Sequence, residues 1–516
     1  MPHIPLNVDQ VSRVKNLAKQ IADQVRDCIA DYSTLSVERT VLRLFGVDGV
    51  DQNGTPLANR IVDLCVKHGD IGSGISTLFT QALLHSGKDS QQTAELISNG
   101  SLDLAKLPAI PPEKIEHKLH ELTSTAIAKL DNSKRIKAEK IARIPLPPQP
   151  WRYLIVATGD IYEDRTQAQS AVYAGADIVA VIRSTAQSLL DYVPYGPTTE
   201  GFGGTYATQA NFRIMREALD AESEDQGRYV RLVNYASGLC MPEIAACAAI
   251  ENLDMLLNDS MYGILFRDIN MQRTFVDQHF SRLICARSDI IINTGEDNYL
   301  TTSDAIENAH TVTASQLINE AMAKNSRLTD DLLGLGHAFE INPEIENALL
   351  YELAHAQLAR ELFPNAPLKY MPPTKYKSTD VFYSHCMDTL FNLASVTTQQ
   401  GIHLNGMPTE AIHTPLMQDR YQSLISVNYI FNSAKSLGDE IEFKADGFIV
   451  RRAQQVLNET EQLLNDIQQC GLMDAITQGI FADIKRPRDG GKGADGVFKK
   501  GPDYANPIMD QLEASA

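Results

Sequence analysis

The chain has 516 residues and a formal net charge of −19. This length supports a large core and more than one domain, and the acidic charge argues against nucleic acid as a main partner, because no net basic field would hold phosphates. No apolar run approaches the ~20 residues that span a bilayer, so we expect no membrane association. Seven cysteines without a CxxC pair indicate neither a disulfide framework nor a metal site, and we expect a reduced, cytoplasmic protein.

Residues 1–150 are predicted to form an N-terminal helical accessory region, because apolar residues recur there at three- and four-residue spacing. The expected helices are Val11–Ile29, Val37–Phe45, Leu57–Val66, Ile75–His85 and Ile115–Leu130, and a basic run follows over Ser133–Arg143. We interpret the basic run as a solvated face rather than as a site for an acidic partner. The proline-rich segment Ile144–Trp151 then predicts an extended linker and a domain boundary, because proline disfavours helix.

Short apolar strands alternate with helices over residues 151–438, which predicts an α/β fold. The expected strands are Tyr153–Thr158, Ile178–Arg183, Val230–Tyr235, Leu253–Leu257, Asp289–Asn293, Gly334–Glu340, Leu368–Met371 and Gly401–Leu404. The expected helices are Arg165–Ala174 (with Asp164 and Gln167 at capping-box spacing), Tyr206–Leu219, Pro242–Glu251, Asn270–Arg282, Ser303–Lys324, Pro343–Glu361, Thr379–Ala394 and Asp419–Leu437. This number and length match a closed (β/α)8, or TIM, barrel. An open doubly wound sheet is the alternative, although no strand–GxGxxG–helix fingerprint supports it.

Residues 439–516 are predicted to form a C-terminal helical and glycine-rich extension. A helix is expected over Phe448–Gln469, and the segment Ile484–Pro502 is basic and rich in glycine. Composition alone favours a disordered tail for this segment. The functional alternative is a strap that docks against a partner or a cofactor.

One buried strand is followed by a set of groups suited to an anion. Ile178–Ile182 is a continuous apolar run, typical of a strand buried on both faces, and Arg183, Ser184, Thr185 and Ser188 come directly after it. A guanidinium and hydroxyls at the carboxyl end of such a strand can bind phosphate. The alternative is that Arg183 pairs with a neighbouring carboxylate and that the serines cap a helix.

Polar side chains also follow the other predicted barrel strands, at the end where ligands of such barrels bind. Tyr262 offers a flat face on which a ring could stack. Asp297 and Lys369 carry opposite charges that suit the ammonium and carboxylate of an amino acid. The alternative is that Asp297 and Lys369 pair with each other across the mouth of the barrel.

Asp277-Gln-His279-Phe-Ser-Arg282 is similar to the start of the cobalamin-binding DxHxxG motif. Arginine replaces the final glycine, and the segment lies within a predicted amphipathic helix. We therefore interpret it as structural.

Three long segments carry a family resemblance: TGDIYEDRTQAQSAVYAGADIVAVIRSTAQSLLDYVPYGPTTEGFGGTYATQANFRIMREAL, ASGLCMPEIAACAAIENLDMLLNDSMYGILFRDINMQRTFVDQHFSR and IKRPRDGGKGADGVF. They resemble the large, α subunit of lysine 5,6-aminomutase, and the resemblance covers essentially the whole chain. It implies an isomerase that uses adenosylcobalamin and pyridoxal 5′-phosphate (PLP) to move the terminal amino group of D-lysine or L-β-lysine to the adjacent carbon by a radical mechanism in lysine degradation.

The resemblance also implies the roles of individual residues. PLP contacts fall on Arg183, Ser188, Ser237, Tyr262 and Arg267, with Ser184, Thr185, Asn234 and Asn298 added from their neighbouring positions, and Tyr262 stands as the catalytic residue. Asp297 and Lys369 correspond to the substrate-binding residues.

A small β subunit is further implied, carrying the cobalamin-binding DxHxxG motif and the lysine that forms the Schiff base with PLP, in a heterotetramer of two α and two β chains. Two alternatives stay open. The first is a related cobalamin-dependent mutase subunit, similar to that of ornithine 4,5-aminomutase or of a carbon-skeleton mutase. The second is a non-catalytic barrel that serves as a scaffold for a cobalamin-binding partner.

Overall fold

The computed structural model describes residues 3–68, 71–182, 189–201 and 203–514. Its helices are α1 (Val8–Ile29), α2 (Leu35–Leu44), α3 (Leu57–His68), α4 (Ile75–Ser86), α5 (Ser90–Ser98), α6 (Pro112–Arg143), α7 (Ile161–Tyr173), α8 (Gln209–Gln226), α9 (Met241–Ile250), α10 (Ser260–Arg267), α11 (Met271–Arg287), α12 (Ala309–Asn325), α13 (Ala348–Leu362), α14 (Val381–Thr397), α15 (Met417–Ser433), α16 (Phe448–Cys470), α17 (Leu472–Gln478) and α18 (Pro507–Ala514). Its strands are β1 (Tyr32–Thr34), β2 (Trp151–Ile155), β3 (Ile178–Ile182), β4 (Arg231–Tyr235), β5 (Met255–Leu257), β6 (Ile291–Asn293), β7 (Leu333–Gly334), β8 (Gly336–Ala338), β9 (Lys369–Met371), β10 (Ile402–Leu404) and β11 (Val497–Lys499).

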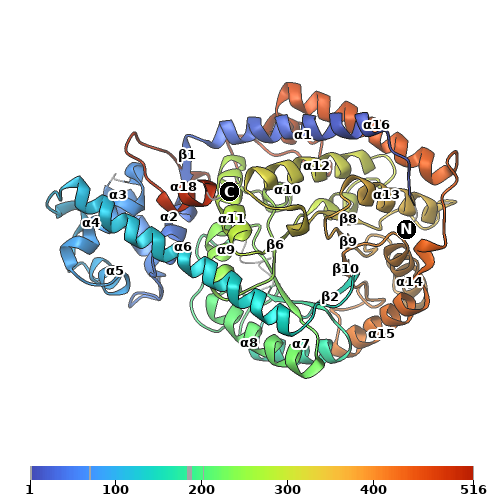
Figure 1. The fold of residues 1–516 in the computed structure, drawn as a ribbon, viewed down its shortest axis with the longest axis horizontal. Coiled ribbons are helices and arrows are strands. Elements are labelled where there is room, and N and C mark those ends of the chain that lie inside the picture. The colour runs from blue at the N-terminus through green and yellow to red at the C-terminus, as the bar shows by residue number, and fades with distance from the viewer. Residues whose placement is uncertain (1–2, 69–70, 183–188, 202, 515–516) are drawn as a thin grey trace.

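A parallel sheet in the order β7-β6-β5-β4-β3-β2-β10-β9-β8 forms the centre of the molecule (Figure 1). Its two end strands, β7 and β8, are separated in sequence only by Leu335, so they are halves of one interrupted strand. Because β7 pairs with β6 and β8 pairs with β9, the sheet returns on itself as a barrel of eight strands. The predicted TIM barrel is confirmed.

Two glycines allow the interrupted strand to approach β6. A Cβ at Gly334 would lie 2.5 Å from Oδ1 of Asn293 and 2.8 Å from the carbonyl oxygen of Ile292. A Cβ at Gly336 would lie 2.7 Å from the carbonyl oxygen of Thr294. A larger residue at either position would push the strand away from its neighbour.

Helices α7, α8, α9, α11, α12, α13, α14 and α15 follow the strands where the sequence predicts helices, and α10 is an additional helix after β5. The predicted capping box of α7 is wrong. This helix begins at Ile161, and the carboxylate of the N-cap residue Asp160 accepts a hydrogen bond from the backbone N–H of Tyr162. Asp164 is instead fully buried and accepts a hydrogen bond from the backbone N–H of Thr158, 2.6 Å away. It therefore ties α7 to the loop after β2.

Helix α6 joins the two helical runs that the sequence predicts separately, and it extends from the N-terminal lobe to the barrel (Figure 1). Its basic segment is not solvated throughout, because Lys137 is only 5% exposed. The ammonium of Lys137 donates hydrogen bonds to the carbonyl oxygens of Leu253, Ser288 and Asp289 at 2.6, 3.2 and 3.1 Å. These carbonyls precede β5 and β6, so Lys137 fastens α6 to the amino-terminal end of the barrel.

The two ends of the chain pack together on the barrel. Helix α1 lies against α12 and α16 (Figure 1), and β1 pairs antiparallel with β11. The glycine-rich segment before β11 is bound to the chain itself: Lys492 N–H donates to the carbonyl of Asp268 at 2.7 Å, and Arg273 donates to the carbonyl of Gly493 at 3.2 Å. The interpretation as a disordered tail is therefore wrong, because α10 and α11 bind this segment. The division at residues 150 and 438 stays a prediction.

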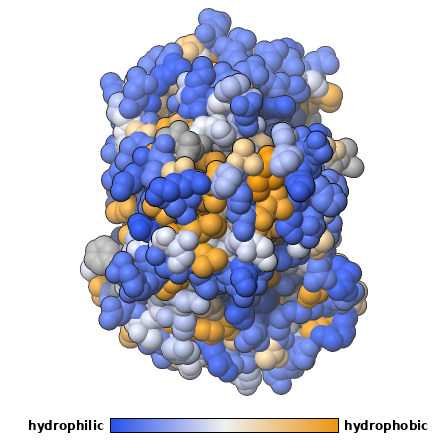
Figure 2. Space-filling view, turned by 90° about the vertical axis from the view of Figure 1, so that its left-hand side faces the viewer, coloured by the Kyte–Doolittle hydropathy of each residue, from blue (hydrophilic) through white to orange (hydrophobic). Residues whose placement is uncertain are grey.

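Figure 2 shows the end of the molecule that carries α3, α4 and α5. Its surface is mostly hydrophilic, and hydrophobic side chains gather near its middle (Figure 2). Among the described residues, no helix combines the length and the apolar character that crossing a membrane requires.

Candidate active site

A cavity of about 310 Å³ lies at the carboxyl-terminal end of the barrel, and we call it the mouth cavity. Its wall includes the last residues of five strands, namely Ile155, Tyr235, Leu257, Met371 and Leu404. Ligands of TIM-barrel proteins bind at this end, and the volume is within the range of small-molecule sites. The mouth cavity is therefore the candidate active site.

Asp297 and Lys369 form an ion pair in the wall of the mouth cavity, with 2.7 Å between Nζ and Oδ2. Lys369 begins β9, and Asp297 lies in the 3-10 turn Glu296–Thr301 after β6. Burial raises the pKa of Asp297, although the Lys369 ammonium acts in the opposite direction. Burial acts to lower the pKa of Lys369, but the Asp297 carboxylate, together with Tyr235 and Glu296, outweighs burial and raises this pKa. The pairing that the sequence left as an alternative is confirmed, and the substrate-binding role stays a prediction.

A buried polar network fixes the turn that carries Asp297. The Asp259 carboxylate accepts a hydrogen bond at 2.9 Å from the backbone N–H of Gly295, directly before this turn. Asn319 donates to Glu296 at 2.7 Å, and Arg282 donates to Asn319 at 2.9 Å. Burial and the neighbouring charge of Asp259 raise the pKa of Glu296 to about 8. This turn is therefore held rigidly by groups that do not reach the cavity.

Tyr262 lies in the wall of the mouth cavity on α10. Arg267 donates a hydrogen bond to the phenolic oxygen of Tyr262 at 3.0 Å, and the ring of Phe266 lies 5.3 Å from that of Tyr262 between centroids. Gly295 leaves room for the tyrosine ring, because a Cβ there would lie 2.8 Å from Cδ2 of Tyr262. The ring orientation is thereby fixed. The cofactor-binding and catalytic roles of Tyr262 and the role of Arg267 stay predictions.

Of the other predicted cofactor-binding residues, Asn298 lines the mouth cavity, whereas Ser237 and Asn234 do not. Asn298 lines the mouth cavity and donates through Nδ2 to Oδ1 of Asp297 at 3.0 Å. Ser237 and Asn234 are buried outside the cavity wall. The hydroxyl of Ser237 accepts a hydrogen bond from the backbone N–H of Asp259 at 2.7 Å and donates to a backbone carbonyl at 3.3 Å. The structure thus places Asp297, Lys369, Tyr262 and Asn298 around one cavity.

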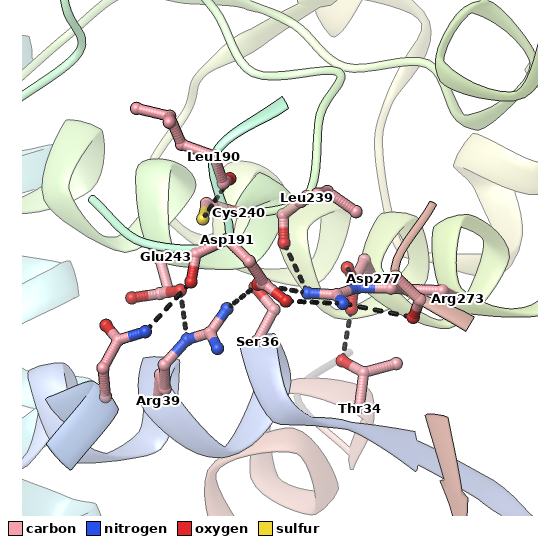
Figure 3. Close-up of polar contacts among 12 residues, drawn as sticks. Thr34, Ser36, Arg39, Leu190, Asp191, Leu239, Cys240, Glu243, Arg273 and Asp277 are labelled. Carbon is pink, nitrogen blue, oxygen red and sulfur yellow. Dashed lines mark hydrogen bonds and ion pairs between the residues drawn. The ribbon is translucent and has the colours of Figure 1, made fainter. Parts of the chain in front are cut away.

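The predicted phosphate-binding residues Arg183, Ser184, Thr185 and Ser188 lie outside the described residues. Downstream of them, Asp191 is held by two arginines from different parts of the fold (Figure 3). Arg273 of α11 binds both carboxylate oxygens, at 2.6 and 2.9 Å, and Arg39 of α2 binds one of them. Burial alone would raise the pKa of Asp191, but the two guanidinium groups outweigh it and lower the pKa to about 2. This segment is therefore anchored to both the N-terminal region and the barrel.

Asn405, Glu410 and Arg420 are further polar residues of the cavity wall. The sequence placed Asn405 among the polar residues after the predicted strands without an individual role, and it marked neither Glu410 nor Arg420. Asn405 is 2% exposed, and neither atom of its side-chain amide has a hydrogen-bond partner among the described residues. A buried donor and acceptor left unpaired in a cavity wall indicate a ligand contact. Asn405 directly follows the last barrel strand, which is where the sequence predicts ligand-binding polar groups. Arg420 lies within α15, where no sequence pattern marks it.

The closed barrel and the charged cavity at its mouth define a TIM-barrel enzyme subunit. A family model described as D-lysine 5,6-aminomutase TIM-barrel domain of alpha subunit matches residues 4–511. The chain belongs to this family of aminomutases, which are isomerases, and the resemblance seen in the sequence is confirmed.

Relatives support the same family. The lysine 5,6-aminomutase alpha subunit of Acetoanaerobium sticklandii is 52% identical over 507 residues, covering 98% of each chain. The lysine 5,6-aminomutase alpha subunit of Fusobacterium nucleatum is 51% identical over 516 residues, covering 99% of this chain and 98% of that protein. The D-ornithine 4,5-aminomutase subunit beta of A. sticklandii is 26% identical over 378 residues, covering 70% of this chain and 51% of that protein. Membership of an alpha-subunit family implies a partner subunit.

Proposed function

We propose that this chain is the barrel subunit of an adenosylcobalamin- and PLP-dependent aminomutase that moves the terminal amino group of D-lysine or L-β-lysine to the adjacent carbon. The observation that carries the proposal is the buried Asp297–Lys369 ion pair in the wall of the mouth cavity. Its two charges match the ammonium and carboxylate of an amino acid. The relatives that are about half identical over nearly the whole chain are lysine 5,6-aminomutase alpha subunits.

The ion pair can recognise an amino acid without leaving a buried charge uncompensated. Asp297 accepts hydrogen bonds from the substrate ammonium, and Lys369 donates to the substrate carboxylate. The zwitterion exchanges one ion pair for two, so the net charge of the cavity does not change. Asn298 donates a hydrogen bond to Oδ1 of Asp297. Oδ2 of Asp297, which contacts Lys369, is therefore the oxygen that would bind the substrate ammonium in place of Lys369. Apolar wall residues such as Met371 and Met407 exclude water from the reacting groups.

The described residues of the cavity fit PLP. Tyr262 presents a flat face whose orientation is fixed by Arg267, and Asn405 offers an unpaired amide to polar groups of the cofactor ring. The phosphate is assigned to Arg183 and Ser188 by the sequence alone. When bound, adenosylcobalamin would supply radical chemistry, and PLP would supply an aldehyde group that can carry an amino nitrogen.

A partner subunit is part of the proposal, because this chain offers neither a cobalamin motif nor an available Schiff-base lysine at the described cavity. Asp277–Arg282 lies inside α11, and Asp277 and Arg282 are fully buried. Lys369 is the lysine among the described lining residues of the mouth cavity, and it is paired with Asp297. The partner is expected to carry DxHxxG and the Schiff-base lysine, in an assembly of two copies of each chain.

The function is tested by co-expressing the chain with a cobalamin-binding partner and following D-lysine, L-β-lysine and D-ornithine by proton NMR. Migration of an amino group away from a terminal carbon leaves a methyl group, which gives a new doublet. We expect this doublet from at least one of the two lysine substrates, and at least a hundredfold slower formation from D-ornithine. Preference for D-ornithine would replace the proposal with the ornithine alternative. No methyl product from any substrate would favour the non-catalytic scaffold.

A further inference from the structure

A second cavity lies at the opposite, amino-terminal end of the barrel, and we call it the basal cavity. Its volume is about 610 Å³, larger than that of the mouth cavity. Its wall is formed by the segment that leads into β2, by residues just before β10, and by the carboxyl-terminal ends of α13, α14 and α15. A cavity of this size is large enough for a small organic ligand.

The basal cavity is positively charged although the chain as a whole carries a net charge of −19. Arg152, Arg360 and Lys435 line it, and none of its described lining residues is acidic. Arg152 pairs with Asp177, but Asp177 also pairs with Arg228, so this group of three keeps one net positive charge. Clustered cations in a concave site attract and concentrate anions.

Arg360 carries a buried charge without a carboxylate partner. The residue is 6% exposed, and one of its terminal nitrogens donates to three backbone carbonyls at the end of α13. Nε and the second terminal nitrogen have no hydrogen-bond partner among the described residues. Some other buried guanidinium groups are paired with carboxylates, such as Arg216 with Asp254 at 2.7 Å and Arg39 with Glu243 at 2.7 Å. Arg360 differs from these because two of its three guanidinium nitrogens are left unpaired by the described residues in the wall of a cavity. A buried charge without a counter-ion is costly, and a bound anion would neutralise it.

Three further donors are available at the rim. Lys435 is exposed and forms no ion pair with a described residue, and the side-chain amides of Gln399 and Asn432 form no hydrogen bond with one. One ammonium, two amides and the buried guanidinium are groups that bind oxyanions.

We propose that the basal cavity is a binding site for a small organic anion with at least two negative charges, such as a phosphate monoester or a polycarboxylate. The site is separate from the mouth cavity and does not depend on the proposed reaction. An anion there would connect Arg360 of α13, Arg152 of β2 and Lys435 beyond α15, and it would stabilise this end of the barrel by binding the folded state.

The test uses the full chain with inorganic pyrophosphate and, separately, citrate as probes, followed by calorimetric titration and thermal unfolding at constant ionic strength. We expect saturable binding of at least one probe, with a Tm that rises with its concentration. Lys435→Glu should weaken binding about tenfold, because it reverses a charge at the rim. The matched control is Lys88→Glu, which reverses an exposed lysine outside the cavity and should leave binding unchanged. Arg360→Gln should abolish binding, with circular dichroism as the check on folding.

Three results would overturn the proposal. The first is no saturable binding of either probe at 10 mM. The second is equal weakening by Lys435→Glu and Lys88→Glu, which would indicate non-specific attraction. The third is loss of binding in Arg183→Ala while Lys435→Glu binds normally, which would place the anion in the cofactor phosphate site. If Arg360→Gln does not fold, the comparison of the two lysine variants still decides.

Discussion

The Asp297–Lys369 pair gives the sharpest prediction, because its two partners can be removed singly or together. Nζ and Oδ2 are 2.7 Å apart, and the side chains are 7% and 1% exposed for Lys369 and Asp297 respectively. Removing one partner of a buried pair leaves an uncompensated charge and costs roughly 3–5 kcal/mol. We therefore expect Asp297→Asn and Lys369→Met each to lower the free energy of unfolding by about this amount, and the double variant to regain most of it.

Substrate binding separates the functional role of the pair from a purely structural one. Loss of one charged hydrogen bond to the substrate costs about 1.5–3 kcal/mol, which is roughly a ten- to hundredfold fall in kcat/KM. If Asp297 and Lys369 bind the substrate, the double variant remains at least as impaired in kcat/KM as either single variant although its stability recovers. PLP affinity should stay near the wild-type value in all three.

The assay combines urea unfolding, PLP titration and steady-state turnover by the two-subunit enzyme. The matched control is the buried pair Arg216–Asp254, whose atoms are also 2.7 Å apart and which lies outside the mouth cavity. Arg216→Met and Asp254→Asn should lower stability to a similar degree, and their folded fraction should keep its kcat/KM. Recovery of turnover together with stability in the Asp297→Asn, Lys369→Met double variant would refute the substrate-binding assignment.

Three further predictions concern Tyr262 in the wall of the mouth cavity, Gly336 beside Asp297, and the buried Glu340, which accepts a hydrogen bond from the backbone N–H of the lining residue Thr374. Tyr262→Phe should keep PLP affinity within about threefold while Tyr262→Ala weakens it about tenfold, because only the second removes the ring; equal affinities in the titration would rule out stacking. Gly336→Ala should cost about 1–3 kcal/mol in urea unfolding and lower kcat/KM, because its Cβ would lie 3.0 Å from Oδ1 of Asp297; unchanged values of both would show that the strand can shift. Burial raises the pKa of Glu340 from 4.5 to about 7, so its contribution to stability is full below pH 4.5 and is lost as the pH rises through 7, by about 3 kcal/mol. Glu340→Gln should remove that loss from the pH dependence of unfolding, and an unaltered profile would contradict the assignment.

Much of the barrel could be predicted because its strands are buried on both faces and therefore read as short apolar runs. The interruption at Leu335 could not be predicted, since it follows from the close approach of Gly334 and Gly336 to β6. The burial of Lys137 was not predicted either, because it also depends on contacts between segments that are distant in the sequence. Its neighbours are backbone carbonyls from distant loops, and no local pattern in a basic run reveals them.

The site was predictable where a polar residue directly follows a strand. Asp297 was found in this way, and the structure brings it together with Lys369. Lys369 was also predicted, but it is the first residue of β9 rather than a residue after the strand. Arg420 reaches the same cavity from a helix, so its position depends on tertiary packing that composition and spacing do not encode. The sequence also did not reveal that the glycine-rich segment before β11 is bound to the barrel, because its partner Arg273 is more than 200 residues away in the sequence.

The central claim is that this chain is one half of a two-subunit aminomutase. The most direct measurement compares turnover of D-lysine and of L-β-lysine by the chain alone, by the cobalamin-binding partner alone and by their mixture, each with both cofactors and with the new methyl doublet as the signal. The account predicts product from the mixture and none from either chain alone. Robust turnover by this chain alone, or none by a mixture in which both subunits are folded and loaded with cofactor, would contradict it.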